Sequence, residues 1–590
     1  MVTAQNNLGA SSSPYLRQHA DNPIWWQEWS ADVLEHARRE NKPLFVSVGY
    51  ATCHWCHVMA AESFVDQGVA DFLNKHFVSI KVDREQRPDI DQYLMAFIAS
   101  QGSHGGWPLN CFLTPDLKPF LALTYIPLQP RYGMPGFLDL LGKVHAHYLS
   151  AGGQIGPFTV EMDEGAEDSE INALRAFRGS FDSQYGGFGD GTKFPPHCTL
   201  LFMLYDLAAS GDTNMKGMIE QTLESILRGG LHDHLQGGFY RYCVDREWTI
   251  PHFEKMIYDQ AMLLWVFSLA FRVIGREEYR VAVVNVLKCL EETFEEGGLY
   301  YSGHDADTHH EEGATYVWSR DELARVLTPD EYARFIGVYQ ITAEGNFEGK
   351  NHLLRVGDAD ISDIENKLLG LRNKRSQPSV DKKIITSWNC LVGIGLIHAY
   401  RYAGVTGALE KAETLAQGLM DKHFIDGKLA HSSFDGTLQK QAFLQDYAGL
   451  LLLLTYLHEE TGRYDAEMRD FSQKIAAFRR DGGWIESFND DFMPVPAASF
   501  DHPVPSSIAL AEFALLRVEV LAGREPAARP YRTPLHHDFF NLAGLAGNGL
   551  FHIIEAPAKI GWEHLPPNSI QRRGGRSVDC FRGACRELKV

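Results

Sequence analysis

The sequence predicts a multidomain protein in which an α/β domain precedes an all-α barrel of paired helices. A Cys-x-x-Cys motif, Cys53 to Cys56, stands between an apolar strand pattern and a helix pattern. Glycine–aromatic loops recur through the later chain at intervals of about fifty to sixty residues, near the upper range for repeat units. The 590 residues exceed the roughly 250–300 that one hydrophobic core supports, so we expect at least two domains.

The first 150 residues alternate between strand and helix patterns. A helix pattern over 30–40, with Ser30 as its expected N-cap, comes first. The following patterns predict a strand at 43–49, a helix at 56–76, a strand at 77–83, a helix at 89–100, strands at 108–113 and 119–125, and a helix at 136–149. The order β-α-β-α-β-β-α is that of a thioredoxin-like domain, which we expect at residues 1–150.

Trp107-Pro108 stands at the start of the third strand in this count. Thioredoxin-like proteins keep a cis-proline at that place, opposite the dithiol. Only about 5–6% of X–Pro bonds are cis, so a trans proline that opens a strand is the alternative. Because the flanking elements have the expected order, we predict a cis bond.

The Cys-x-x-Cys motif predicts a redox site. Cys53 would begin a helix, where unpaired N–H groups and the helix dipole favour a thiolate, the attacking species in disulfide exchange. We expect Cys53 to attack, Cys56 to resolve and Pro108 to shape the substrate groove. His54 and His57 are placed to stabilise the thiolate.

Two other sites share the C-x-x-C-H pattern. Attachment of c-type haem needs an export signal and an oxidising compartment, and we find neither in the sequence. A structural zinc site needs a second cysteine pair, and Cys580 and Cys585 have an unusual spacing for one. We therefore expect no metal and no cofactor, and the remaining alternative is a vestigial motif. The odd total of nine cysteines favours reduced thiols.

Residues 151–168 are glycine-rich and then acidic, which predicts a linker. Residues 169–590 carry long helix patterns, with strand patterns short and confined to loops. The expected helices are 197–210, 214–228, 254–274, 277–294, 387–403, 408–423, 440–461 and 506–521. Six helical pairs would close into an (α/α)₆ barrel, because closure leaves no end to cap. A helical array that does not close is the alternative.

Charged and aromatic residues concentrate where the expected helices begin, at the predicted barrel mouth. Paired carboxylates beside aromatic platforms are typical of sugar chemistry, in which one group protonates and the other removes a proton or attacks. Taken singly, each residue is more often a helix cap or a buried ion pair. Glu254 and Asp259 are expected within one helix. The candidate catalytic residues are His252, Glu254, Asp259, Asp305, Asp307 and Asp446, and the candidate substrate-binding residues are Arg241, Tyr242, Asp245, Trp248, Trp388 and Asn389.

The net charge of −21 argues against nucleic acid or an anionic membrane as a partner, because both attract basic surfaces. No stretch approaches the roughly 20 uninterrupted apolar residues of a membrane span, and no signal peptide is visible. We expect a cytoplasmic location.

Several strings together resemble the spermatogenesis-associated protein 20 (bacterial YyaL) family. They include Cys53-His54-Trp55-Cys56-His57-Val58-Met59, Lys81-Val82-Asp83-Arg84-Glu85, Gly105-Gly106-Trp107-Pro108-Leu109, Asp305-Ala306-Asp307 and Thr386-Ser387-Trp388-Asn389. The resemblance implies a thioredoxin-like domain joined to a six-hairpin, glycosidase-like barrel similar to that of N-acylglucosamine 2-epimerases.

Three functions stay open at this point. The barrel can bind a small carbohydrate and isomerise, epimerise or hydrolyse it. The dithiol can act on a protein thiol or disulfide, with the barrel presenting the substrate. The chain can also be a binding or scaffold protein in which both sites are vestigial.

Overall fold

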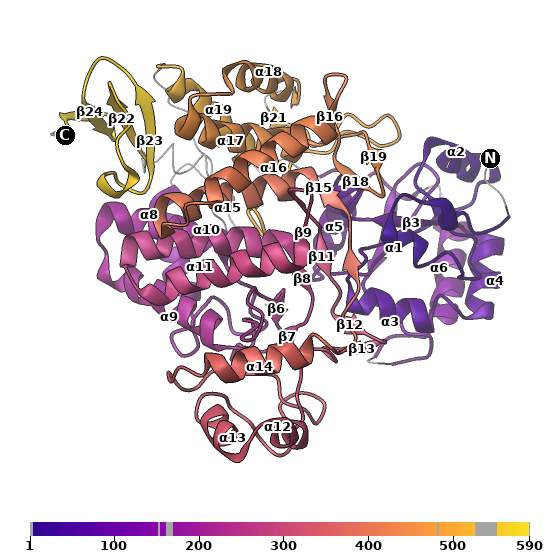
Figure 1. The fold of residues 1–590 in the computed structure, drawn as a ribbon. Helices are drawn as coiled ribbons and strands as arrows, with labels where there is room; N and C mark the ends of the chain where they lie inside the picture. Colours follow the sequence, from indigo (N-terminus) through magenta and orange to yellow (C-terminus); the bar gives the residue numbers. More distant parts are fainter. Residues whose placement is uncertain are drawn as a thin grey trace.

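The computed structural model describes residues 4–131, 133–151, 154–160, 169–480, 483–524 and 551–588. Figure 1 shows a helical barrel in the centre, the N-terminal domain in indigo at its right, and a C-terminal sheet in yellow at the upper left. The predicted linker, 151–168, falls largely outside the described residues. Its described part packs on the N-terminal domain, where Phe158 contacts Tyr93 and Phe97 edge-on at 5.5 and 5.2 Å.

The N-terminal domain has the predicted thioredoxin-like fold. Its five-stranded sheet has the order β1 (Gln27–Glu28), β3 (Val78–Asp83), β2 (Leu44–Gly49), β4 (Leu109–Leu113) and β5 (Pro119–Leu123). Strands β1, β3 and β2 are parallel, and β4 and β5 are antiparallel to their neighbours. Every residue of β2 and β3 is buried, which explains their nearly continuous apolar runs.

Helices cover both faces of this sheet, with two separate cores. Apolar residues of α2 (Ala31–Glu40) and α5 (Pro88–Ser100) share one core, and those of α3 (His54–Glu62), α4 (Gln67–His76) and α6 (Phe137–Ala151) share the other. The prediction of a single helix at 56–76 is wrong, because a short loop separates α3 from α4. Asp66 caps the second helix by accepting the N–H of Val69 at 2.9 Å.

The later chain forms the predicted helical barrel, and all eight helices expected there are present near their predicted bounds. The inner helices are α8 (His197–Ser210), α10 (Ile257–Ile274), α15 (Thr386–Ala403), α17 (Leu444–Thr461) and α19 (Ser507–Leu521). The outer helices are α7 (Ser169–Ser180), α9 (Thr213–Arg228), α11 (Glu277–Cys289), α16 (Ala408–His423) and α18 (Asp465–Ala476). The described residues thus hold five outer–inner pairs.

Burial distinguishes the two rings. Helices α10, α15 and α17 are buried on nearly every side, whereas α9, α11, α16 and α18 bury one stripe each. Each inner helix packs on the next in the order α8, α10, α15, α17, α19. Helix α10 is long and apolar enough to cross a membrane by composition, but 78% of it is buried inside the protein.

Two further parts were not predicted. Helices α12 (Arg320–Val326), α13 (Pro329–Ile336) and α14 (Ser362–Arg372) form a lobe with its own core, at the bottom of Figure 1. Near the C-terminus, β23 (Ser569–Arg573), β22 (His552–Ala556), β24 (Val578–Phe581) and β25 (Ala584–Glu587) make a four-stranded sheet. The expectation of strands in loops only is wrong here. Cys580 and Cys585 face each other across β24 and β25 and form a disulfide, so they are not the reduced thiols expected.

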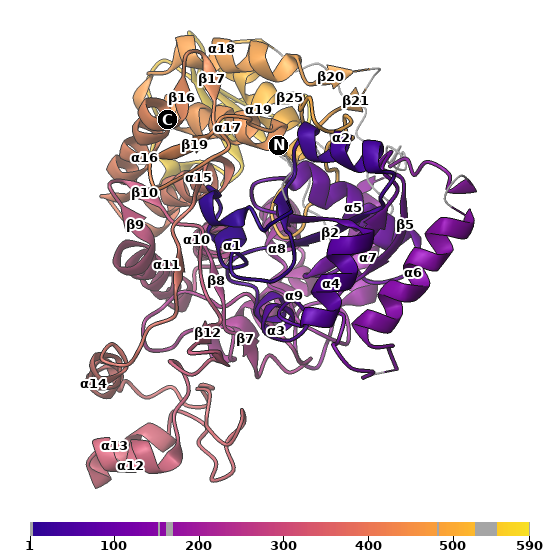
Figure 2. The same ribbon diagram turned by 90° about the vertical axis from the view of Figure 1, so that its right-hand side faces the viewer.

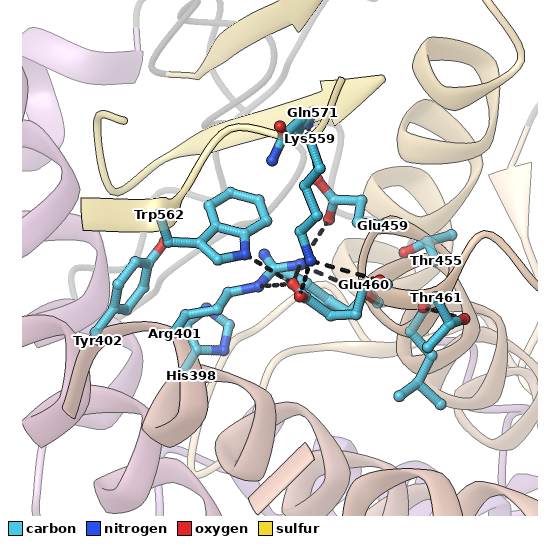
Figure 3. A network of polar contacts seen from close by, with 12 residues as sticks. His398, Arg401, Tyr402, Thr455, Glu459, Glu460, Thr461, Lys559, Trp562 and Gln571 are labelled. Carbon is cyan, nitrogen blue, oxygen red and sulfur yellow. Dashed lines mark hydrogen bonds and ion pairs between the residues drawn. The ribbon is translucent and has the colours of Figure 1, made fainter. Parts of the chain in front are cut away.

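The C-terminal sheet closes the barrel at the C-terminal ends of its inner helices. Figure 3 shows the polar network that attaches it. Glu460 pairs with Arg401 at 2.7 Å, contacts Lys559, and accepts the indole N–H of Trp562 at 2.9 Å. The Arg401 guanidinium also lies 3.7 Å over the Trp562 ring. The predicted residues Asp259 and Asp446 lie at the opposite mouth, in the first turns of α10 and α17.

The thioredoxin-like domain covers that opposite mouth, at the N-terminal ends of the inner helices (Figure 2). A fully buried lysine joins the two parts. Lys383 Nζ lies 2.6 Å from Asp83, 2.8 Å from Glu85 and 3.1 Å from Asp381. Because Asp83 ends β3 and Glu85 follows it, this cluster fixes the carboxyl end of that strand against the barrel.

Candidate functional site

The Cys-x-x-Cys motif lies where β2 ends and α3 begins. Cys53 is the N-cap of α3, and its Sγ accepts the backbone N–H of Cys56 at 3.2 Å. The two cysteines form a disulfide, with only 4% and 1% of their surfaces exposed. The bond between Trp107 and Pro108 is cis, as predicted, and the Trp107 ring packs edge-on against Tyr50, 5.8 Å away. The helix start and the cis-proline loop therefore meet as in a thioredoxin-like site.

A carboxylate of the barrel holds the loop that precedes Cys53. Tyr50 Oη and Thr52 Oγ1 donate hydrogen bonds to the two oxygens of buried Glu254, at 2.9 and 3.1 Å. Burial and the Glu254 charge raise the pKa of Tyr50. The prediction that Glu254 lies in a helix is wrong. It lies between the short strands β7 (Pro251–His252) and β8 (Lys255–Met256), and β8 pairs with β11 (Gly303–His304), so α10 begins only afterwards.

The two histidines of the motif face a second group of barrel carboxylates, where Figures 1 and 2 place α3 beside β12 (Asp307–Thr308). His54 Nδ1 lies 2.8 Å from Asp307 Oδ1. His57 Nδ1 lies 3.6 Å from Asp305 Oδ1 and 3.5 Å from Asp307 Oδ2. Burial disfavours the charged form of His57, but the two carboxylates outweigh it and raise its pKa to about 9. The ring nitrogens expected to stabilise a thiolate thus also contact the barrel.

The same two aspartates respond differently to their surroundings. Burial raises the pKa of Asp305, against the lowering effect of His57. For Asp307, burial is outweighed by His54 and His57, which hold its pKa below the usual range. Another carboxylate, Glu312, lies 3.0 Å from His252 Nδ1 and 3.9 Å from His54 Nε2. The rim is therefore a cluster of alternating histidines and carboxylates.

A deeper cluster surrounds the first turn of α10. Asp259 lies 3.5 Å from His197 Nε2 and 4.0 Å from Arg241 Nε, and all three side chains are buried. Within the described ranges, neither oxygen of Asp259, nor Nε2 of His197, nor Nη1 of Arg241 has a hydrogen-bond partner. Burial raises the pKa of Asp259 to about 8, although Arg241 opposes the shift. Burial lowers the pKa of His197 to about 3.

A cavity of about 130 Å³ lies beside His197. Its lining is Phe188, Thr192, Phe194, Pro196, His197, Cys198, Thr199, Asp501 and His502. Phe194 stacks on Tyr242 at 4.5 Å, and the Arg241 guanidinium lies 5.4 Å from the Phe194 ring. Burial lowers the pKa of His502 to about 4 and raises that of Asp501. The cavity thus combines aromatic surface with two imidazoles that are neutral near pH 7, His197 and His502, and with the buried carboxyl of Asp501.

Trp388 lies near the deeper cluster and packs edge-on against Tyr258 at 4.7 Å. Four other predicted residues bond to the protein itself. Asp446 accepts two backbone N–H groups and pairs with His431 at 2.8 Å. Asn389 bonds the backbone of Tyr300 in both directions. Asp245 accepts the N–H groups of Thr249 and Ile250, and Trp248 donates to the carbonyl of Gly186. Their contacts shape the loops of the mouth.

Comparisons with known proteins place the chain in a family. Residues 5–163 match the family model described as "Protein of unknown function, DUF255" (Thioredox_DsbH). An uncharacterized protein of Caenorhabditis elegans, B0495.5, is 33% identical over 89% of this chain and 81% of its own length. Human spermatogenesis-associated protein 20 is 30% identical over 88% of this chain and 76% of its own. The chain belongs to the spermatogenesis-associated protein 20 family.

Among solved structures, a D-mannose isomerase is similar to this member of the spermatogenesis-associated protein 20 family. The alignment covers 61% of this chain and 82% of the isomerase chain, at 14% identity and a TM-score of 0.42.

Sequence reasoning on this family member missed several residues of both clusters. His197 is the first residue of an ordinary apolar helix pattern, and Glu312 lies in a hairpin that no pattern predicted. Asp501 and His502 come from the segment before α19. Each is joined to its cluster by a contact far along the chain, and a single sequence carries no signal for such contacts. The nearest usable signal was Lys193-Phe194-Pro195 beside His197, which belongs to the family resemblance.

Proposed function

We propose that the barrel binds a small carbohydrate beside α10 and that Asp259 and His197 move a proton on it, as in isomerisation or epimerisation. The observation that carries the proposal is this buried acid–base pair, 3.5 Å apart, whose facing atoms have no hydrogen-bond partner in the described part of the chain. Buried polar atoms without partners are uncommon and call for an explanation such as a ligand or water.

The protonation states suit proton transfer. His197 Nδ1 lies 3.1 Å from the carbonyl oxygen of Pro503, so Nδ1 carries the hydrogen and Nε2 presents a lone pair. Because the pKa of Asp259 is about 8 and that of His197 about 3, the carboxyl is protonated and the imidazole neutral at pH 7. The carboxyl can donate a proton and the imidazole can accept one, which are the two roles required.

The surroundings suit a polyhydroxylated ligand. Arg241 Nη1 is a buried donor that has no hydrogen-bond partner in the described ranges, and Phe194 and Tyr242 form an aromatic face beside it. The cavity volume of about 130 Å³ is large enough for several groups the size of a water molecule, because one water needs only about 10–15 Å³. A sugar offers hydroxyls to the polar groups and an apolar ring face to the aromatic ones.

Proton transfer at carbon is tested by deuterium exchange. The full-length protein is incubated in D₂O with a panel of aldoses, ketoses and their phosphates. Proton NMR follows loss of the signal of the hydrogen on the carbon next to the carbonyl group, which is C2–H in an aldose and C1–H in a ketose. We expect exchange with at least one sugar, and at least a hundredfold slower exchange for Asp259→Asn and for His197→Gln. The exposed control Asp435→Asn should exchange like the wild type. No exchange with any sugar, or exchange unchanged in both variants, would refute the proposal.

A second candidate function, thiol–disulfide exchange, is favoured by Cys53 at the N-cap of α3. The Cys53 thiolate would attack a substrate disulfide, and Cys56 would then attack Cys53 Sγ, so that two electrons pass to the released substrate thiols. Because only 4% of Cys53 is exposed, a small or extended disulfide suits the site better than a folded surface. Glutathione disulfide and insulin reduction by the reduced protein test it. Cys53→Ser should abolish both activities, and unchanged activity in that variant would contradict this role.

A further inference from the structure

Three side chains at the junction of the two domains converge on one point. His57 comes from α3, one residue after the dithiol, and Asp305 and Asp307 come from the barrel rim. One ligand atom of each lies within 4.8 Å of the other two. We propose that His57, Asp305 and Asp307 bind a divalent transition-metal ion, with Zn²⁺ as the best match, between the dithiol helix and the barrel. This differs from the absence of a metal site that the sequence predicted, and it is independent of the proposed proton transfer at Asp259.

The distances match ligands of one ion better than a hydrogen bond. His57 Nδ1 lies 3.6 Å from Asp305 Oδ1 and 3.5 Å from Asp307 Oδ2. Two ligands at about 2.1 Å from a tetrahedral Zn²⁺ lie about 3.4 Å apart. A charge-assisted N–H···O bond is about 2.7–2.9 Å long, considerably shorter than either separation.

The orientation of the His57 ring also suits a ligand. Its Nε2 lies 2.8 Å from the carbonyl oxygen of Ala51, which accepts a hydrogen bond. The carbonyl therefore fixes the hydrogen of the neutral ring on Nε2 and leaves the Nδ1 lone pair directed at the two carboxylates. Metal binding would replace the proton that Nδ1 carries in the imidazolium form, because only the lone pair coordinates.

Each carboxylate uses its other oxygen for a supporting bond. Ser379 Oγ donates to Asp305 Oδ2 at 2.9 Å, and His54 Nδ1 lies 2.8 Å from Asp307 Oδ1. Such outer partners orient the ligands of metal sites. The oxygens near His57 are Asp305 Oδ1, which also accepts the backbone N–H of Asp307 at 3.1 Å, and Asp307 Oδ2. A carboxylate oxygen has two lone pairs, so Asp305 Oδ1 keeps one for an ion.

Two carboxylates face the single imidazolium of His57, so the cluster suits an ion of higher charge. Asp305 and Asp307 are only 5% and 9% exposed, and in the described part of the chain neither pairs with a lysine or an arginine. Glu312 adds a further negative charge 3.9 Å from His54. Two buried carboxylates repel each other, and a doubly charged ion would offset both. Three protein ligands leave a fourth tetrahedral position for water, as in catalytic zinc sites.

Metal binding is measured directly on the full-length protein with its disulfides oxidised. The chain is treated with a chelator, dialysed, and titrated with ZnCl₂ by calorimetry, and with Co²⁺, whose visible absorption reports tetrahedral coordination. We expect one ion per chain, and at least tenfold weaker binding in Asp305→Asn and Asp307→Asn. His310→Gln, a neighbouring exposed histidine, should bind like the wild type.

A double variant, Cys53→Ser with Cys56→Ser, separates this site from binding by thiolates. It should keep the ion, and loss of binding in it would overturn the proposal. So would a stoichiometry well below one ion per chain, or unchanged affinity in both aspartate variants. Melting in the presence of chelator identifies variants that fail to fold, and a variant that melts as the wild type does must still show the loss.

Discussion

The protonation state of Asp259 makes a prediction about stability that needs no substrate. Asp259 is fully buried, and its pKa is raised from 3.8 to about 8. Replacing it with asparagine keeps the shape of a protonated carboxyl and removes the titration. We therefore expect Asp259→Asn to become more stable relative to the wild type as the pH rises.

The sign and size follow from the proton balance. Between the unfolded pKa and the folded pKa, the folded wild type holds a proton that the unfolded chain has released, so its stability falls with rising pH. The difference of about four pKa units corresponds to roughly 5–6 kcal/mol, at about 1.4 kcal/mol per unit. Between pH 5 and pH 8 the free energy of unfolding of Asp259→Asn should gain roughly 4 kcal/mol on that of the wild type.

Urea denaturation at pH 5, 6, 7 and 8, followed by fluorescence and circular dichroism, measures this difference. Only the change of the difference with pH is used, so titrating groups shared by both proteins cancel. Asp435→Asn, at an exposed position, should show no such change. A flat difference for Asp259→Asn, or one that moves in the wild type's favour, would mean that Asp259 is ionised and paired with Arg241, and the acid–base assignment would fail.

Three further predictions concern the contacts between the parts. Lys383→Met leaves three buried carboxylates without their cation and should lower the free energy of unfolding by about 3–5 kcal/mol, whereas exposed Lys382→Met should cost less than about 1 kcal/mol in urea titrations. Glu460→Gln weakens the bonds to Arg401 and Lys559, so limited proteolysis should release the C-terminal sheet faster, without faster cleavage elsewhere. Gly49→Ala puts a Cβ 2.7 Å from Cys56 Sγ and 2.3 Å from Tyr15 Oη, and should lower the melting temperature, whereas Gly142→Ala, with open space around it, should not.

Local signals made most of the elements predictable. The apolar runs of β2 and β3 and the mostly apolar pattern of α10 reflect burial on nearly every side, which composition alone reveals. The break between α3 and α4 was missed because apolar residues continue through it at helical spacing, while a single aspartate cap decides the boundary. The C-terminal sheet was missed because its strands are four or five residues long.

The sequence could predict several residues that belong to the clusters, but not which of these residues contact one another. The sequence singled out Glu254, Asp259, Asp305 and Asp307 as candidate catalytic residues at the predicted barrel mouth, and the structure buries all four. Their partners are distant in sequence: Tyr50 lies 204 residues from Glu254, and His54 lies 253 residues from Asp307. Which carboxylate meets which base depends on how the thioredoxin-like domain docks on the barrel, and no local pattern encodes that geometry.

The docking of the thioredoxin-like domain on the barrel gives the predicted carboxylates different hydrogen-bond partners. They therefore differ in whether their oxygens are available to a ligand. Both oxygens of Glu254 accept hydrogen bonds from hydroxyl groups of the loop before Cys53. This carboxylate therefore positions the loop that carries the dithiol. Asp305 and Asp307 each present one oxygen to His57, an arrangement suited to an ion, although that oxygen of Asp305 also accepts the backbone N–H of Asp307. Asp259 alone of the four keeps both oxygens without a hydrogen-bond partner among the described residues, and it lies beside a neutral histidine, His197, that lines a cavity. A substitution at Glu254 should therefore disturb the dithiol before it disturbs proton transfer, and one at Asp259 should do the reverse.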